Sequence, residues 1–298
     1  MGVDGVGGLS MKKSILFLAC AALIFASCAK VDRDEVAPEK GKRLLTLRAT
    51  VDEPGTRLSV NGSGKFSWQQ YDYITVFKES NGSYSVDLSH ALNDGPTGDF
   101  EVYLDDDETI SYAMYPASDY SEFDTANNTL LFGLDERYDY VLGSTYMPML
   151  GSDITVEDEY YYIKASFKAV GGVLKLTINN FPTGEDVDIQ YLRFSVSGKR
   201  ITGSFPIQED ADGKKYIETE DYVSGSDNGT NYIDIEYQGG YYTRTMTYYF
   251  PLPCGTYNDL SFTLYDGCDE PIFSRTARID GGLTVHRNEV ITAPALNL

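Results

Sequence analysis

The chain has 298 residues and a formal net charge of −21 at pH 7. So acidic a chain repels nucleic acid and anionic lipid headgroups, which excludes polyanion binding as its function. Its 24 tyrosines and 28 glycines, set against few strong helix formers, favour an all-β fold with many turns.

The N-terminal segment has the layout of a secretory signal. Lys12 and Lys13 precede an uncharged run at residues 14–25, and the small residues Ala26 and Ser27 follow it. The run is too short for a comfortable membrane span, which needs ~20 apolar residues. We therefore expect residues 1–27, an upstream extension and a signal peptide, to be removed.

Cys28 comes directly after the small pair and shortly before charged residues. A thiol at that place can be alkylated by a diacylglycerol, after which the preceding peptide is cut away and the new amino terminus is acylated, as in bacterial lipoproteins. Several acyl chains hold a protein on a membrane permanently, whereas one chain binds only marginally. We predict that Cys28 is lipidated; the alternative is an apolar residue near a cleavage site. Residues 28–43 have few apolar side chains and are expected to form a flexible tether.

Residues 45–51 are expected to form the first strand. Leu45, Leu47, Ala49 and Val51 alternate with polar residues, so their side chains share one face. After a break, further strands in this half are expected at residues 73–77, 100–104, 110–115, 129–132 and 146–150. Asn-Gly pairs, which are typical of tight hairpin turns with positive φ at both positions, occur at residues 61–62, 81–82 and 228–229.

Residues 151–159 (GSDITVEDE) interrupt this pattern, and acidic residues gather there. We place a domain boundary at this point, which predicts an N-terminal β-sandwich over residues 44–157 and a C-terminal β-sandwich over residues 158–298. Short strands separated by a turn every ~8–12 residues are typical of sandwiches. The second half is expected to have strands at residues 161–169, 173–178, 189–196, 203–207, 232–237, 243–250, 260–265, 272–279 and 290–293.

Cys254 and Cys268 flank residues 260–265 (LSFTLY), which alternate as a strand does. A strand between them would hold the cysteines ~25 Å apart, whereas a disulfide requires Cα atoms within ~7 Å. We predict two free thiols, both mostly buried.

Local motifs for catalysis are missing from the sequence. Histidine occurs only at His90 and His286, no Cys-x-x-Cys is present, and nothing resembles a G-x-S-x-G elbow. Residues 105–108 (DDDE) could bind calcium, although consecutive acids on a short loop usually face water. Residues 209–213 (EDADG) do not fit the twelve-residue calcium loop and favour a hairpin turn. We therefore predict no enzyme, no cofactor and no metal.

Two runs of tyrosine could form stacking platforms for sugar rings, at residues 160–162 and 241–242. Tyrosines in β-sandwiches more often pack with the ring inside and the hydroxyl at the rim. A surface glycan-binding lipoprotein stays open as the alternative function.

Several local features follow one another in a recognisable order. They are the lipobox ending at Cys28, the first strand LTLRATV, the loop at Thr56 and Arg57, Trp68 followed by Asp72 and YITVF, and later FKAVGGVLKLTI and FPLPCGTYNDLSFTLYD. In these features, which span nearly the whole mature chain, the protein resembles the fimbrillin-like lipoproteins of Bacteroidetes, the subunits of protease-assembled (type V) pili.

The resemblance implies two tandem transthyretin-like β-sandwich domains and export to the outer membrane as a lipid-anchored protein of the cell surface or fimbrium. It implies assembly with other pilus subunits by donor-strand exchange: a trypsin-like protease cuts after an arginine downstream of the first strand, and a neighbour's extended segment fills the groove. It also implies a role in adhesion, to a receptor that the sequence does not identify. The stalk, tip and anchor roles stay open, because no extra tail follows the last expected strand.

Strand exchange has a physical basis in residues 45–51. A removed strand leaves unpaired backbone groups beside an apolar slot, and a foreign alternating strand would satisfy both. Arg43, Arg48 and Arg57 are candidate cleavage sites. Arg48 lies within the expected strand, where hydrogen bonding hides it, whereas Arg57 follows Pro-Gly in an expected loop. We predict cleavage at Arg57, the alternative being that it is a solvated loop residue.

Overall fold

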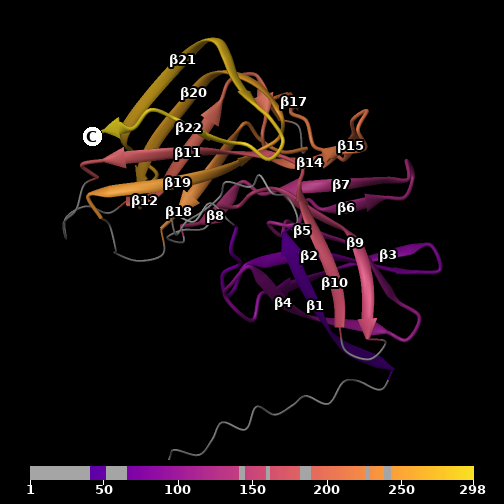
Figure 1. Ribbon diagram of the computed structural model, residues 1–298. Coiled ribbons are helices and arrows are strands. Elements are labelled where there is room, and N and C mark those ends of the chain that lie inside the picture. Colours follow the sequence, from indigo (N-terminus) through magenta and orange to yellow (C-terminus); the bar gives the residue numbers. More distant parts are fainter. Residues whose placement is uncertain are drawn as a thin grey trace, which may run out of the picture. The chain divides into compact units, whose positions relative to one another are not determined.

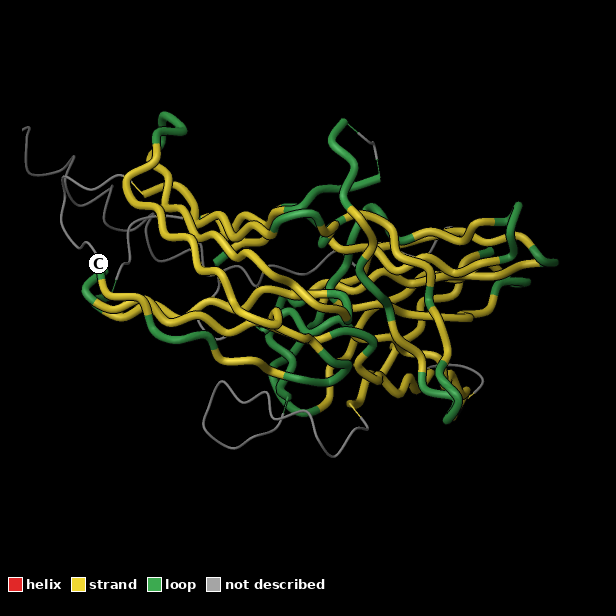
Figure 2. The backbone as a smooth tube through the Cα atoms, turned by 90° about the horizontal axis from the view of Figure 1, so that it is seen from above, coloured by secondary structure: helices red, strands yellow, loops and turns green. Residues whose placement is uncertain are grey.

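The computed structural model describes residues 41–51, 66–140, 145–158, 162–181, 189–225, 228–237 and 243–298. Over these ranges the chain consists of strands and loops with no helix, as Figure 2 shows. The predicted all-β class is therefore confirmed. Within the same ranges no helix is long and apolar enough to cross a membrane.

The first sheet has seven strands in the order β3-β2-β5-β9-β10-β1-β4 (Figure 1). Neighbouring strands are antiparallel except β1 and β10, which are parallel. Strands β3 and β4 form the two edges of this path, so β1 has a partner on each side. The bounds are β1 Lys42–Val51, β2 Tyr73–Ser80, β3 Ser83–His90, β4 Thr97–Asp105, β5 Thr109–Tyr115, β9 Met149–Asp158 and β10 Tyr162–Ala169.

The fully buried indole of Trp68 lies in the core that this sheet covers. Edge-to-face contacts, with ring centroids 4.9–5.3 Å from the indole, come from Phe66, Phe100, Tyr115 and Phe167. Such contacts add ~0.5–1.5 kcal/mol per pair beyond the burial of area. Gly98 of β4 makes room for the ring, because a Cβ there would lie 2.8 Å from Trp68 Cγ.

Two further sheets enclose a second apolar core. One has the order β21-β20-β12-β18-β8, and in the other β11 pairs with β19, β22 and β23. Both contribute to one cluster, for example through Phe250 of β19 and Phe194 of β12, whose ring centroids are 4.9 Å apart. The bounds are β8 Arg137–Asp139, β11 Gly172–Asn179, β12 Ile189–Val196, β18 Tyr232–Glu236, β19 Thr245–Leu252, β20 Gly255–Asp266, β21 Pro271–Val285, β22 Val290–Thr292 and β23 Leu296–Asn297.

Small sheets complete the described structure. Three strands pair in the order β14-β7-β6, and two more pairs are β13-β17 and β15-β16. A third apolar cluster, which includes Phe132 of β7 and Phe205 of β14, lies here. The bounds are β6 Glu122–Asp124, β7 Thr129–Leu134, β13 Lys199–Arg200, β14 Gly203–Pro206, β15 Gln208–Glu209, β16 Lys215–Tyr216 and β17 Glu220–Asp221.

Strand pairing crosses the boundary expected between residues 157 and 158. Strands β9 and β10 lie on its two sides and pair with each other, as do β7 with β14 and β8 with β18. The chain leaves the seven-stranded sheet after Ala169. The division into two transthyretin-like domains stays a prediction.

The expected interruption at residues 151–159 is wrong as a reading of local structure, because β9 covers Met149–Asp158. Only residues 149–151 of β9 pair with β5, whereas its pairing with β10 continues to residue 158. At residues 152–156, where β9 has a single neighbour, the side chains are half-buried or exposed, so polar residues occur there beside Ile154 and Val156.

Of the turns predicted from the sequence, some are confirmed and one is wrong. Asn81 and Gly82 have φ values of 51° and 79° and join β2 to β3, which confirms that hairpin. The pair at residues 61–62 lies outside the described residues. The hairpin predicted at residues 228–229 is wrong, since β17 and β18 on either side pair with other strands. The turn at residues 209–213 is confirmed between β15 and β16, where Asp210 Oδ1 accepts backbone N–H bonds of Asp212 and Lys214, both 2.9 Å.

Both cysteines of the second half are free. Cys254 is partly buried, and this burial raises the pKa of its thiol to about 11. The prediction of a buried thiol is wrong for Cys268, which is exposed in the turn between β20 and β21.

Candidate functional site

The predicted exchange strand is β1, which lies between β10 and β4 (indigo in Figure 1). Its first apolar positions point into the core: Leu45 is 6 % exposed, and Leu47 and Ala49 are 0 % exposed. Val51 is half-buried and packs against the same core. The apolar face expected from the sequence is thus the buried face of the strand.

Backbone pairing holds β1 on both sides. Residues 46–51 pair with residues 162–167 of β10, and residues 42–50 pair with residues 97–105 of β4. Loss of β1 would leave two strands with unpaired N–H and C=O groups on either side of an apolar slot. Burial of two leucines alone stabilises the strand by roughly 3–6 kcal/mol.

Arg48 is held by both neighbours of β1. Its guanidinium donates to both carboxylate oxygens of Asp99 on β4, at 2.9 and 3.2 Å, and lies 5.0 Å from the ring centroid of Tyr162 on β10. The second candidate, Arg43, is exposed, and its Nη2 makes three long contacts of 3.3–3.4 Å to backbone carbonyls at the end of β4 and in the turn that follows it. Cys28 and the preferred cleavage site, Arg57, lie outside the described residues.

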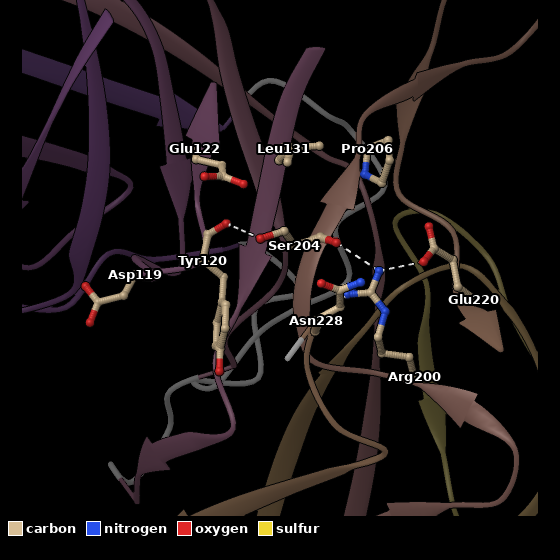
Figure 3. A pocket seen from close by; sticks show the side chains of 9 residues that line it. All are labelled: Asp119, Tyr120, Glu122, Leu131, Arg200, Ser204, Pro206, Glu220 and Asn228. Carbon is tan, nitrogen blue, oxygen red and sulfur yellow. Dashed lines mark hydrogen bonds and ion pairs between the residues drawn. The ribbon is translucent and has the colours of Figure 1, made fainter. Parts of the chain in front are cut away.

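A polar pocket of about 440 Å³ lies where β6, β7, β13, β14 and β17 meet (Figure 3). The lining includes the side chain of Arg200, which is 7 % exposed and held by several hydrogen bonds. That guanidinium donates to Glu220 Oε2 at 2.7 Å, to the Ser204 carbonyl at 2.9 Å and to the Asn228 carbonyl. It also lies 4.3 Å from the ring centroid of Phe205.

These contacts make Arg200 a structural tie. The hydroxyl of Ser204, drawn in Figure 3, donates to the carbonyl of Tyr120 at 2.7 Å and so links β14 to the chain before β6. The other acids on the wall are Asp119 and Glu122, both exposed. Within the described ranges, no group of three or more His, Cys, Asp and Glu side chains is arranged to hold a metal ion.

A second pocket, of about 430 Å³, lies near the start of β2 and the end of β5. We call it the tyrosine pocket; its lining includes Tyr71, Asp72, Tyr73, Asp135, Arg137 and Tyr146. Asp72 is 8 % exposed, and burial raises its pKa to about 6, against hydrogen bonds from the Gln69 backbone and the Tyr115 hydroxyl that lower it. Burial also raises the pKa of Asp135.

The tyrosine pocket was not expected from the sequence. The tyrosine runs singled out there lie almost entirely outside the described residues, and the one described member, Tyr162, packs under the guanidinium of Arg48. The only local signal for the pocket is the short stretch Tyr71, Asp72 and Tyr73. Its other walls come from segments far along the chain.

No protein-family model and no curated protein matches the chain. Solved structures similar to it include candidate cell adhesion proteins of Bacteroides uniformis (11 % identity, 88 % of this chain and 94 % of that chain, TM-score 0.43) and Bacteroides ovatus (13 %, 86 % and 92 %, 0.43). The fimbrial anchor protein Mfa2 of Porphyromonas gingivalis is similar at 12 % identity over 78 % of this chain and 82 % of that chain, with a TM-score of 0.32.

Proposed function

We propose that the chain is a subunit of an adhesive pilus that assembles with other subunits by donor-strand exchange. A trypsin-like protease cuts the chain after β1, β1 leaves the sheet, and an extended segment of a neighbouring subunit takes its place. The observation that carries this proposal is the position of β1. It is an apolar strand with a paired neighbour on each side, so its loss creates a groove that only another strand can fill.

Arg57 is the proposed cleavage site. It follows β1 in the sequence, so a cut there separates the whole strand from the rest of the sheet. A cut at Arg48 would leave three residues of β1 attached, and the side chain of Arg48 is engaged by Asp99. Arg57 is therefore preferred over Arg48.

The chain reaches the cell surface, in this proposal, as an outer-membrane lipoprotein attached through Cys28, with residues 28–43 as its tether. A stalk or tip subunit loses its lipid when the chain is cut at Arg57. An anchor keeps it. Mass spectrometry of surface material separates the two: an uncut chain that begins at lipidated Cys28 supports the anchor role and contradicts the stalk role.

Limited digestion of the purified mature protein tests strand exchange. We expect trypsin to produce a new amino terminus at Leu58, and the cleaved protein to take up a fluorescent peptide of residues 42–51. Arg57→Ala should block that cut, whereas Arg43→Ala, the matched control, should not. The same peptide with Leu47→Asp should bind at least tenfold more weakly, because a carboxylate would enter the apolar slot.

Two results would contradict the proposal. One is a protein cut at Arg57 that retains β1 under native conditions and neither exchanges the labelled peptide nor forms species of high mass. The other is equal uptake of the native and the Leu47→Asp peptides, which would mean that the peptide does not bind in the apolar slot left by β1.

A further inference from the structure

Two tyrosines have an unusual backbone conformation. Among the described residues, the non-glycine positions with φ between 45° and 76° are Tyr71, Asn81, Asn128, Tyr146, Asn180, Asp269 and Asn288. Asparagine and aspartate adopt this conformation readily, whereas a bulky side chain there is an outlier that costs ~1–3 kcal/mol. The two exceptions, Tyr71 at 76° and Tyr146 at 45°, both line the tyrosine pocket.

The rim of this pocket exposes aromatic rings. Tyr71 is 63 % exposed and Tyr73 is 51 % exposed. His90 packs against both, with its ring centroid 6.0 Å from that of Tyr71 and 5.8 Å from that of Tyr73. The rings are thus supported by a third ring, and part of each still faces water.

The lining of the same pocket includes a fixed polar group. The buried Asp72 carboxylate accepts a hydrogen bond from the Gln69 backbone N–H at 2.8 Å and another from the Tyr115 hydroxyl at 3.2 Å. Its position therefore does not depend on a ligand. A site in which aromatic walls surround a few well-placed polar groups is the usual composition of a small-molecule pocket.

The walls carry charges of both signs. Asp135 accepts a hydrogen bond from the Ser118 hydroxyl at 2.5 Å, and Arg137 forms an ion pair of 2.9 Å with Glu236 while 71 % of its side chain stays exposed. A purely apolar guest would remove water from these groups without replacing its hydrogen bonds. A lysine side chain has donors but no acceptor, so it would pair with the carboxylates of Asp72, Asp135 and Asp139 and offer nothing to the guanidinium of Arg137. A neutral guest with many hydroxyl groups can donate to the carboxylates and accept from the arginine.

We propose that the tyrosine pocket binds a saccharide. The C–H face of one sugar ring stacks on Tyr71 or Tyr73, and its hydroxyl groups bond to the carboxylates and to Arg137. The volume of about 430 Å³ falls within the ~300–1,000 Å³ of typical ligand pockets. This site does not use β1, so it is independent of strand exchange and supplies a direct means of adhesion.

Titration of the uncleaved mature protein tests the site. The probes are the neutral methyl glycosides of glucose, galactose, mannose, fucose and N-acetylglucosamine, and binding is followed by isothermal calorimetry and by NMR. We expect at least one to bind with a Kd of about 1 mM or tighter, which corresponds to about −4 kcal/mol. Tyr71→Ala and Tyr73→Ala should each weaken that binding at least tenfold.

Tyr103→Ala is the matched control, because Tyr103 on β4 is 44 % exposed and lies outside the lining of the pocket. It should leave binding unchanged. The proposal is overturned if no glycoside binds with a Kd of about 10 mM or tighter, which corresponds to a binding free energy of about −3 kcal/mol. It is equally overturned if both pocket variants bind as the native protein does, or if a lysine-rich peptide binds the pocket and the sugars do not.

Discussion

Arg48 of β1 and Asp99 of β4 lie directly opposite each other in the antiparallel pairing of the two strands. The guanidinium donates from Nε to Oδ1 at 2.9 Å and from Nη2 to Oδ2 at 3.2 Å, so the pair is bidentate. Because the guanidinium also lies over Tyr162 of β10, one side chain of β1 contacts both neighbouring strands. The outer face of the strand is thus held by a charged contact and its inner face by apolar burial.

A double-mutant cycle measures this contact. The side chains are 38 % and 29 % exposed, so water and salt screen the pair. We expect Arg48→Ala and Asp99→Ala to couple by about 0.5–1 kcal/mol in urea unfolding at low salt, and by less at 1 M salt. Zero coupling at low salt would show that the pair makes no net contribution to holding β1.

The inner face should contribute more. Leu47→Ala removes a side chain that is 0 % exposed, so we expect the free energy of unfolding to fall by about 2–5 kcal/mol. Leu44→Ala, on the same strand but at a position that is 40 % exposed, should cost less than about 0.5 kcal/mol. Equal losses in urea unfolding would contradict the assignment of the two faces.

Arg193 of β12 and Asp234 of β18 form a largely buried ion pair in the sheet β21-β20-β12-β18-β8. Both hydrogen bonds are 2.8 Å, Asp234 is 2 % exposed, and the guanidinium lies 4.0 Å from the ring centroid of Tyr232. Arg193→Ala leaves the buried carboxylate of Asp234 without its ion-pair partner. We therefore expect the free energy of unfolding, measured by heat or urea, to fall by about 3–5 kcal/mol.

The neighbouring pair of Arg137 and Glu236 supplies the control. It also joins β18 to another strand, but its side chains are 71 % and 30 % exposed. Arg137→Ala should cost no more than about 1 kcal/mol. If the two arginine variants lose the same stability, burial is not what distinguishes the pairs.

Local alternation was enough to predict the strands that have one buried face. For β12, the predicted and observed bounds coincide at Ile189–Val196, because buried residues alternate along most of it. Strand β3 was missed, although Tyr84, Val86 and Leu88 alternate with polar residues along it. It is an edge strand whose alternating apolar side chains stay exposed, with Val86 at 44 % and Leu88 at 57 %, and Ser89 is its one buried residue.

Pairing between distant segments could not be predicted in the same way. Strands β7 and β8 join partners beyond residue 200, and nothing in their own sequence specifies those partners. The same holds for the tyrosine pocket. Tyr71 and Tyr146 meet there because of the fold, and a tyrosine with positive φ has no local sequence signal. The apolar face of β1, by contrast, was readable from four alternating residues.

Asp72 should make stability depend on pH in a direction opposite to that of a salt-bridged acid. Burial raises its pKa from 3.8 to about 6 in the folded protein. Between these values the folded state holds a proton that the unfolded state has released. The stabilisation is therefore complete below pH 3.8 and is lost as the pH rises through about 6, a loss of about 3 kcal/mol in all.

Asp72→Asn removes this titration. We expect its free energy of unfolding, relative to that of the native protein, to rise by up to about 3 kcal/mol between pH 4 and pH 7 in urea experiments on both proteins. Tyr115→Phe removes a hydrogen bond that lowers the pKa of Asp72, so it should move the window to higher pH. A difference between Asp72→Asn and the native protein that stays constant from pH 4 to pH 7 would show that the carboxylate is not desolvated in the folded chain. The carboxylate of Asp72 in the tyrosine pocket would then be open to water.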